Sequence, residues 1–405
     1  MSNSFDTIVV GLGAMGSATL YQLAKRGVKA LGIDHLAPPH NLGSSHGDTR
    51  ITRQAIGEGD HYTPLSLRSY EIFRDMEEQA NVSLLQVTGG LMISSLTQPV
   101  SVVHVPQFFE NTVAAAKRFG IKHDILNAKQ IRSRFPQFNV DDDELGYFEY
   151  ESAYLRPEEI VRVQLKLAAS LAATIHTNEY VIGFEENAKG VEVHTNLGSY
   201  QAEHLVLSVG PWLTALLPEL QSVFKVYRQV LYWFDIENSY EQFAEAKFPI
   251  FIWQLKGEEA GVYGLPAVDG ALGGFKIGSS NYLTEPVTPD TVSRTVSHEE
   301  TDQMFATKVL RCFPLARRKC IKTAVCLYTV TPDSGFVVDW LPSKLSAQTS
   351  SKRIVLCSPC SGHGFKHAAA IGESIAEMVT TGHSRLDLSA FSLGRFSQLT
   401  EAYLT

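Results

Sequence analysis

The sequence predicts an α/β chain in two parts, one wound around a parallel sheet and one built on a largely antiparallel sheet. The chain has 405 residues, which is more than a single hydrophobic core usually supports. An apolar run, a glycine-rich turn and a helical pattern follow one another in residues 8–34. Aromatic and polar residues alternate between positions 226 and 281, and this period of two is typical of antiparallel strands.

The parallel part begins with a glycine fingerprint. Apolar residues 8–10 predict a buried strand, and Gly11, Gly13 and Gly16 separate it from a helix. These glycines allow a tight turn, a close approach of a pyrophosphate to the backbone, and packing of helix on strand. The next strand, 30–33, delivers Asp34 to the hydroxyls of a ribose. The order indicates a Rossmann-like dinucleotide site for an adenosine without a 2′-phosphate, and it leaves NAD and FAD both open.

Further elements follow from periodicity and from turn residues. We expect helices over 62–79 and 157–173, a strand over 87–93 around two glycines, and short strands at 174–177, 180–184, 191–194 and 199–202. A strand over 204–209 then returns the chain to the nucleotide-binding part. Residues 353–357 read as its last strand, followed by a glycine-rich turn at 361–366 and a helix to about position 380.

Composition narrows the class of protein. The chain is 44% hydrophobic and 19% charged, and its net charge of −8 is spread without long blocks of one sign. This charge pattern predicts no nucleic-acid partner and no binding to an anionic membrane. The residues before the first strand lack the features of a signal peptide, and no apolar run reaches the ~20 residues of a membrane helix. We therefore expect a cytoplasmic enzyme with no membrane partner.

The five cysteines, at positions 312, 320, 326, 357 and 360, argue against a disulfide framework because their number is odd. Cys357 and Cys360 have the spacing of a redox pair or half of a zinc site. No second pair at a suitable spacing accompanies them, so we expect small buried residues and no metal. A dithiol switch and a structural zinc are the alternatives.

Residues 43–68 read GSSHGDTRITRQAIGEGDHYTPLSLR. This stretch resembles the monomeric sarcosine oxidase and N-methyltryptophan oxidase family, flavoproteins of the D-amino-acid-oxidase superfamily. The resemblance continues through residues 227–230, 263–266, 275–278, 326–333 and 361–366. It implies that the nucleotide is FAD. It also implies an FAD-binding domain of residues 1–90, 150–218 and 322–405, a substrate domain of residues 91–149 and 219–321, and a monomer.

The resemblance also implies how the cofactor is held. In the family, the cysteine that matches Cys326 carries the flavin as an 8α-thioether, so covalent FAD is expected. Cys320 lacks the sequence that follows Cys326 and is the nearest wrong choice. The fingerprint and the resemblance together predict cofactor contacts from Gly11, Gly13, Met15, Gly16, Asp34, His35, Ser44, Val181, Cys326, Gly362, His363, Gly364, Phe365 and Lys366.

Catalytic and substrate-binding residues come from the same resemblance. Lys276 matches the lysine that lies over the flavin and promotes its reaction with oxygen, where a fixed positive charge stabilises superoxide-like character. Residues 43–53 read from composition alone as a surface loop with solvated arginines; the resemblance makes them an active-site loop under the flavin, with His46, Thr49 and Arg50 matching.

Arg53 and Lys366 match the pair that binds the substrate carboxylate, and a lysine at a helix start needs an anion to offset the helix dipole. Tyr263 matches a tyrosine of the substrate pocket. Ser45 and Ser280 stand where the family has histidines, so the surroundings of the flavin and the pocket are changed.

We therefore expect an FAD-dependent oxidase of secondary amino acids, such as the N-methyl amino acid sarcosine. It would oxidise the C–N bond to an imine and reduce O2 to hydrogen peroxide. The alternatives are an oxidase of cyclic or glycated amino acids, a flavin dehydrogenase that passes electrons to a carrier, and a non-enzymatic nucleotide-binding protein. The side chain of the substrate stays open.

Overall fold

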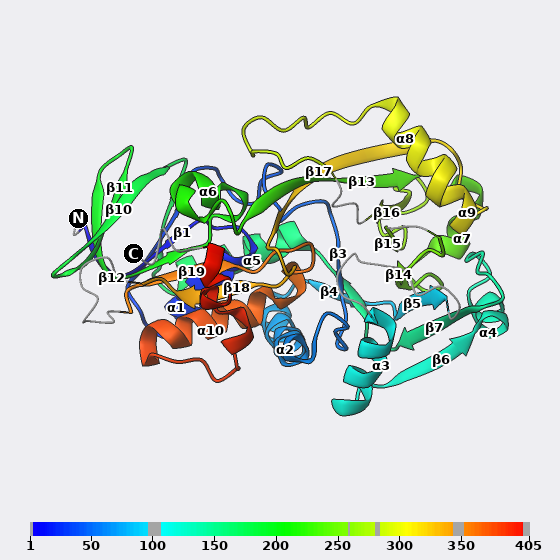
Figure 1. Ribbon diagram of the computed structural model, residues 1–405, viewed down its shortest axis with the longest axis horizontal. Helices are drawn as coiled ribbons and strands as arrows, with labels where there is room; N and C mark the ends of the chain where they lie inside the picture. Colours follow the sequence, from blue (N-terminus) through cyan, green and yellow to red (C-terminus); the bar gives the residue numbers. More distant parts are fainter. Residues whose placement is uncertain (1–2, 96–106, 258–259, 280–283, 343–351, 400–405) are drawn as a thin grey trace.

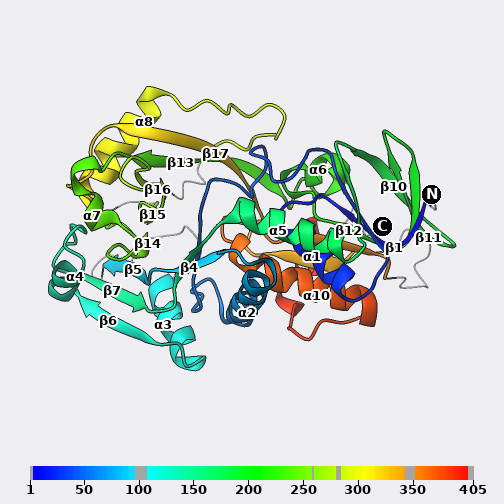
Figure 2. The same ribbon diagram turned by 180° about the vertical axis from the view of Figure 1, so that it is seen from behind.

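The structure is a computed structural model that describes residues 3–95, 107–257, 260–279, 284–342 and 352–399. Two large sheets lie side by side along the long axis of the molecule (Figure 1), and the view from behind shows the same arrangement (Figure 2). The predicted fold class is confirmed, because one sheet is mainly parallel with helices packed against it and the other is mainly antiparallel.

The first sheet has a parallel centre. Its order is β10-β11-β12-β1-β2-β9, and β19 pairs with β12 and β18. The chain returns to it three times: from 4 to 34, from 174 to 207 and from 337 to 358. Its strands are β1 (Ser4–Val10), β2 (Ala30–Asp34), β9 (Thr174–Thr177), β10 (Val181–Asn187), β11 (Gly190–Thr195), β12 (Ser199–Leu207), β18 (Val337–Trp340) and β19 (Ile354–Ser358). The two strands expected at 199–202 and 204–209 form one continuous strand, β12.

Four helices pack around this sheet: α1 (Ala14–Lys25), α2 (Thr63–Ala80), α5 (Pro157–Ser170) and α10 (Ala368–Thr381). Helices α1 and α10 lie very close together. A Cβ atom at Gly372 would lie 2.5 Å from the backbone carbon of Ala18, so only glycine fits there. Burial on this scale at ~25 cal/mol per Å² of apolar surface fixes the helices on the sheet.

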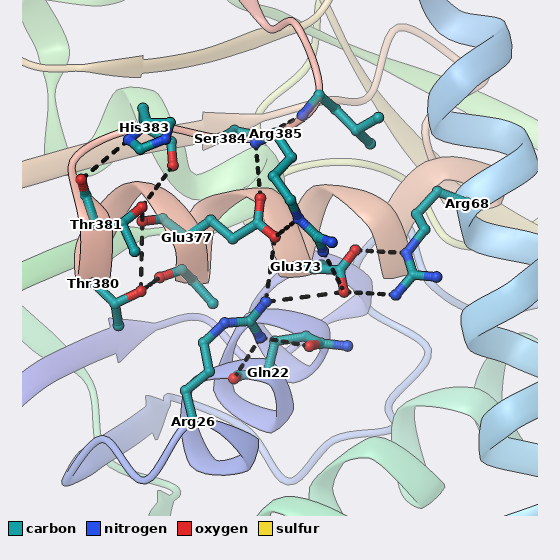
Figure 3. A network of polar contacts seen from close by, with 12 residues as sticks. Gln22, Arg26, Arg68, Glu373, Glu377, Thr380, Thr381, His383, Ser384 and Arg385 are labelled. Atoms are coloured by element: carbon teal, nitrogen blue, oxygen red, sulfur yellow. Dashed lines mark hydrogen bonds and ion pairs between the residues drawn. The ribbon is translucent and has the colours of Figure 1, made fainter.

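An ion-pair network ties the helices to the segment that follows α10 (Figure 3). Glu373 and Glu377 of α10 are nearly buried. Arg68 of α2 donates to both oxygens of Glu373, at 2.7 and 2.8 Å, and Arg385 donates to Glu377 at 2.6 Å. Arg26, at the end of α1, lies 3.5 Å from Glu377. The surrounding arginines lower the pKa of Glu373 against the opposing effect of burial, so it stays ionised.

The second sheet has the order β17-β13-β16-β15-β14-β5-β7-β6. It is antiparallel except where β14 pairs in parallel with β5. Phenylalanines 138, 248, 251, 275 and 313 form the centre of the hydrophobic core beside it. Its strands are β5 (Gly90–Ser95), β6 (His123–Asn127), β7 (Glu144–Glu149), β13 (Lys225–Phe234), β14 (Ile250–Trp253), β15 (Val262–Leu265), β16 (Phe275–Ser279) and β17 (Cys320–Val330).

A small third sheet of β3 (Arg50–Thr52), β8 (Ala153–Leu155) and β4 (Leu85–Val87) supports the loop that follows β2. The strand expected over 87–93 is two strands, because Gly89 has a φ of 72° and breaks it. The remaining helices are α3 (Phe108–Arg118), α4 (Ala128–Arg134), α6 (Leu213–Leu216), α7 (Tyr240–Phe243), α8 (His298–Met304) and α9 (Leu310–Cys312), with a π-helical turn, Phe305–Val309, and short 3₁₀ turns at Asp60–Tyr62, Gly210–Trp212, Pro218–Leu220, Glu237–Ser239, Phe365–His367, Ser389–Phe391 and Leu393–Leu399.

Most strands fall in the domain ranges expected from the sequence, but β17 belongs to the second sheet although most of it lies after position 322. The two-domain division itself stays a prediction. Within the described ranges, no helix combines the length and the apolar character that crossing a membrane requires. The cytoplasmic location also stays a prediction.

Candidate active site

A cavity of about 860 Å³ lies between the two large sheets. The first sheet contributes the glycine turn after β1 and the end of β2, and the second contributes side chains of β13, β15 and β16. Most of the predicted site residues line it. Gly16, His46 and Cys326 do not; they lie behind its wall, Gly16 because it packs α1 on β1 and the other two because Arg50 and the loop 43–49 cover them.

The glycine turn forms one end of the cavity. Gly11 has a φ of 84°, and a Cβ atom there would lie 2.5 Å from the carbonyl oxygen of Ser208. A Cβ atom at Gly16 would lie 1.7 Å from the carbonyl oxygen of Gly11. The N-cap of α1 is Gly13, which has no side chain to cap the helix. Backbone N–H groups at this terminus therefore face a space that fits a phosphate.

Asp34 sits at the end of β2, as predicted, and lines the cavity. Its carboxylate accepts hydrogen bonds from the backbone N–H groups of Leu12 at 2.7 Å and Leu36 at 2.8 Å, so it also shapes the glycine turn. The rings of His35 and Trp212 meet edge to face with centroids 4.6 Å apart. Met15 and Val181 complete an apolar wall that suits an adenine.

Ser45 has a clear place, although the resemblance left it open. Its hydroxyl oxygen accepts a hydrogen bond from the backbone N–H of Ala14 at 3.1 Å, which joins the loop 43–49 to the first turn of α1. Ser44 donates to the carbonyl oxygen of Leu327 at 2.5 Å. The loop is thus fixed between the glycine turn and β17. Ser280 lies outside the described residues.

Lys276 lies at the other end of the cavity and is 2% exposed. Its Nζ donates to the carbonyl oxygens of Gly47 and Thr49, both at 2.7 Å, and lies 5.3 Å from the ring centroid of Trp233. Burial, and secondarily the charge of Arg50, holds the pKa of Lys276 well below its usual range.

The turn that holds Lys276 is unusual in its backbone. Gly47 has a φ of 105° and Asp48 a φ of 65°. Glu158, in the first turn of α5, accepts hydrogen bonds from both of their N–H groups, at 2.6 and 3.1 Å. These bonds hold a conformation that non-glycine residues rarely adopt. Sequence reasoning missed Glu158, because nothing in the sequence connects the start of this helix to the loop.

Cys326 is 1% exposed, on β17. Its Sγ lies 3.4 Å from Nη2 of Arg50 and 3.6 Å from Nε2 of His46. Burial raises the pKa of Cys326, but Arg50 and His46 outweigh it and lower the pKa to about 6. The pKa of each of the other four cysteines is raised, chiefly by burial. Cys326 is therefore the thiol that is ionised at neutral pH.

Arg53 and Lys366 also line the cavity and are nearly buried, at 0% and 5% exposed. Arg53 donates to the carbonyl oxygen of Ala55 and to the carboxylate of Glu58, both at 2.5 Å, and its Nε–H is buried without a partner among the described residues. Lys366 donates to the carbonyl oxygen of His363 at 2.6 Å. Burial lowers the pKa of Lys366 to about 7, with a smaller contribution from Arg53 against the opposing charge of Glu58.

Tyr263 faces the same end of the cavity, and its hydroxyl lies 2.9 Å from that of Tyr328. The turn Gly362, His363, Gly364 and Phe365 closes the wall next to Lys366. Glu58 and Tyr328 were missed from the sequence. Both stand inside the stretches that carry the resemblance, but their roles depend on which side chains meet across the cavity.

Comparison with known proteins agrees with this geometry. The family described as FAD dependent oxidoreductase matches residues 6–378. The chain belongs to this family. It is 36% identical over 399 residues to a monomeric sarcosine oxidase of Streptomyces avermitilis, covering 98% of this chain and 99% of that protein. It is 32% identical over 392 residues to an N-methyl-L-tryptophan oxidase of Yersinia pestis, covering 97% and 99%.

Solved structures share the fold of the family. NikD, an amino acid oxidase essential for nikkomycin biosynthesis, superposes with a TM-score of 0.80 at 21% identity, covering 96% of this chain and 97% of that one. L-proline dehydrogenase from P. horikoshii gives a TM-score of 0.78 at 19% identity, covering 98% and 99%. The predicted family and the dependence on FAD are thus confirmed, and the protein is an FAD-dependent oxidoreductase.

Proposed function

We propose that this protein is an oxidase of secondary amino acids, an N-methyl amino acid such as sarcosine among them, with oxygen as the electron acceptor. One observation carries the proposal: two buried cations, Arg53 and Lys366, line the same cavity as Lys276. The first two suit a carboxylate and the third suits oxygen. The names of the relatives, sarcosine oxidase and N-methyl-L-tryptophan oxidase, support an N-methylated substrate.

The residues of the cavity fit FAD. The uncapped start of α1 suits the pyrophosphate, and Asp34 suits a ribose. Residues Gly43–Arg50, Lys276 and Tyr263 would surround the flavin ring. When bound, FAD supplies the two-electron oxidation of the substrate C–N bond and the return of the electrons to oxygen. The protein positions the substrate, excludes water and supplies fixed charges.

Cys326 is the residue we propose for covalent attachment through the 8α position. It is the thiol with a lowered pKa, and the positive charge of Arg50 next to it stabilises the thiolate. Its neighbours on the same strand point the reactive side toward the loop 43–49, as the contacts with His46 show. The other buried cysteines lack a cationic partner of this kind.

Arg53 and Lys366 would hold the substrate carboxylate. A guanidinium binds a carboxylate through two parallel hydrogen bonds, and the lysine adds a point charge. Glu58 occupies Arg53 in this structure, so an incoming carboxylate has to compete with Glu58 or share the guanidinium with it. The buried Nε–H of Arg53 is the donor left over for that purpose. A substrate without a carboxylate offers no such exchange.

Lys276 would act in the reaction with oxygen. Its ammonium group is held by neutral carbonyl oxygens, so no carboxylate bonded to it cancels its charge. A fixed positive charge in a dry site stabilises the negative charge that develops on oxygen. Hydrogen peroxide is then the product. The monomeric state implied by the resemblance stays a prediction.

Two measurements test the proposed function. The purified protein should keep its yellow colour after acid precipitation, and Cys326→Ser should release FAD into the supernatant. Adding sarcosine and larger N-methyl amino acids in air should produce peroxide, while N-methylamines that lack the carboxylate should not. Release of free FAD from the wild type would remove the covalent link only. Oxidation of decarboxylated amines as fast as of the acids would contradict the substrate class.

A further inference from the structure

Residues 284–297, which we call the strap, connect β16 with α8 and form neither helix nor strand. The strap leaves the second sheet and extends toward α6, beside the first sheet, in both views (Figures 1 and 2). Two hydrogen bonds fix it there. Nε1 of Trp212 donates to Asp290 at 3.4 Å, and Nη2 of Arg294 donates to the carbonyl oxygen of Leu42 at 2.7 Å. The strap therefore bridges the two large sheets.

The strap also forms part of the cavity wall, through Pro289, Asp290, Val292 and Arg294. Five lysines and arginines line the cavity in the described chain. Four of them, Arg50, Arg53, Lys276 and Lys366, gather at the end assigned to the flavin ring and the substrate. Arg294 is the fifth, and it contacts the loop after β2, next to the nucleotide end.

Arg294 has one arm in use and one arm without a partner. Nη2 donates to Leu42 and, more weakly at 3.4 Å, to Pro289. Nη1 is buried and has no hydrogen-bond partner among the residues that the structure describes. A buried N–H of a charged group without an acceptor is costly, so such a group in a cavity wall indicates a ligand that supplies the acceptor.

The position of Arg294 identifies the part of the cofactor that it faces. Its charge acts on His40, which lies beside His35 and Trp212 at the adenosine end, and it interacts electrostatically with Cys326 at the flavin end. The guanidinium thus lies between the two ends. The middle of an FAD that spans them is its pyrophosphate, and a planar fork of N–H donors matches phosphate oxygens.

We propose that Arg294 is a second contact for the pyrophosphate of FAD, supplied by the strap in addition to the glycine turn. The glycine turn binds with backbone N–H groups, whereas Arg294 adds a full positive charge from a segment about 280 residues later in the chain. Closure of the strap and retention of FAD are then coupled. The inference rests on the proposed function only for the place of the flavin ring beside Cys326.

The test measures binding of flavins to the full-length Cys326→Ser protein after removal of its FAD. Arg294→Gln keeps a donor for Leu42 and removes the charge. We expect it to raise the Kd for FAD by at least about tenfold, as for the loss of a charge-assisted hydrogen bond, and to leave the Kd for riboflavin within about twofold. Riboflavin lacks both phosphates, so it reports on packing alone. Quenching of flavin fluorescence gives both constants.

Arg228→Gln is the matched control. Arg228 donates to the carbonyl oxygens of Ser293 and Thr295 and so anchors the same strap from β13, but it does not line the cavity. We expect its Kd for FAD to stay within about threefold of that of the parent protein. If Arg294→Gln does not fold, Arg294→Lys replaces it, with a smaller loss of FAD affinity that high salt removes.

An unchanged Kd for FAD in Arg294→Gln would overturn the proposal, and so would equal losses for FAD and riboflavin or equal losses in the Arg228 control. Failure of the covalent-flavin assignment appears elsewhere, as FAD released from the acid-precipitated wild type. In that case the wild type serves as the parent, and the comparison of Arg294 with Arg228 is unchanged.

Discussion

The two ends of the cavity bind in different ways. At the nucleotide end, Gly11, Gly13 and Asp34 come from one short stretch, and the binding groups are mainly backbone N–H groups made accessible by glycine. At the other end, Lys276, Arg53 and Lys366 come from distant segments and bring charged side chains out of water. The first end depends on space and the second on charge, so replacements that preserve volume but remove charge should damage only the second.

The charged end is also where ionisation is altered. Burial lowers the pKa of Lys276 and of Lys366, while the pKa of Cys326 falls because cations surround its thiol. Glu58 and Glu158 provide negative charge on two sides of this end, each bonded to groups of the loop 43–58. The difference between the two ends therefore predicts a pH dependence that arises at the second end alone.

The largest effect should come from Lys276→Met, which keeps volume and removes the charge. We expect reoxidation of the reduced flavin by oxygen to slow by at least ~100-fold, with ~3 kcal/mol as the worth of one preorganised electrostatic contact. Anaerobic reduction by substrate should change much less. Stopped-flow measurement of both half-reactions decides this. Lys322→Met is the control, because Lys322 lies over the same Trp233 ring but is half exposed and paired with Asp48. An unchanged oxygen rate constant would leave Lys276 a structural role.

Arg53→Ala should have the next largest effect. Loss of a desolvated charge-assisted hydrogen bond, ~1.5–3 kcal/mol, predicts a KM for N-methyl amino acids at least ~10-fold higher. The reaction of reduced flavin with oxygen should not change, because Arg53 is not bonded to Lys276. Steady-state kinetics with Arg132→Ala as the control, an arginine paired with Asp142 at the surface, measures the difference. Equal KM values in both variants would remove Arg53 from the substrate site.

Lys366 predicts a pH dependence of carboxylate binding. With a pKa of about 7 it is a cation below that pH and neutral above it, so an anionic ligand binds less tightly as the pH rises through 7. We expect the Kd of an amine-free carboxylate, such as propionate, to rise by ~3–10-fold between pH 6 and pH 9, the range that follows from ~0.7–1.4 kcal/mol for one partly compensated charge. Titration monitored by flavin absorbance gives the profile, and Lys366→Met should flatten it. A slope that persists in the variant would mean that another group titrates.

Glu158→Gln should give the smallest effect. The amide can still accept from the N–H of Gly47, but the negative charge near Lys276 is lost, which lowers the pKa of Lys276 further. We expect reoxidation to slow by ~2–5-fold at pH 8 and its pH profile to shift toward acid, since a charge at this distance is worth ~1 kcal/mol in a medium of intermediate dielectric. Glu159→Gln, its neighbour paired with Arg162, is the control. A profile that does not move would restrict Glu158 to holding the turn.

Sequence reasoning reached the parts of the site whose signals are local. The glycine fingerprint, Asp34 and the strands around them form in the predicted order, because the spacing of these residues is set by one strand, one turn and one helix. The resemblance added Lys276, Arg53, Lys366 and Cys326. The strand over 87–93 was wrong because two adjacent glycines gave no indication that the first takes a left-handed conformation against Phe148.

By itself, the sequence determined the fold class, the nucleotide end of the cavity and the family, because periodicity and short motifs act over neighbouring residues. Only the tertiary structure decided which charges meet. It placed Glu58 on Arg53, Glu158 on the turn that holds Lys276, and an unpaired arm of Arg294 in the cavity wall. The physical reason is that the free energy of a buried charge depends on every partner within a few ångströms, and those partners come from segments that meet only when the sheets pack together.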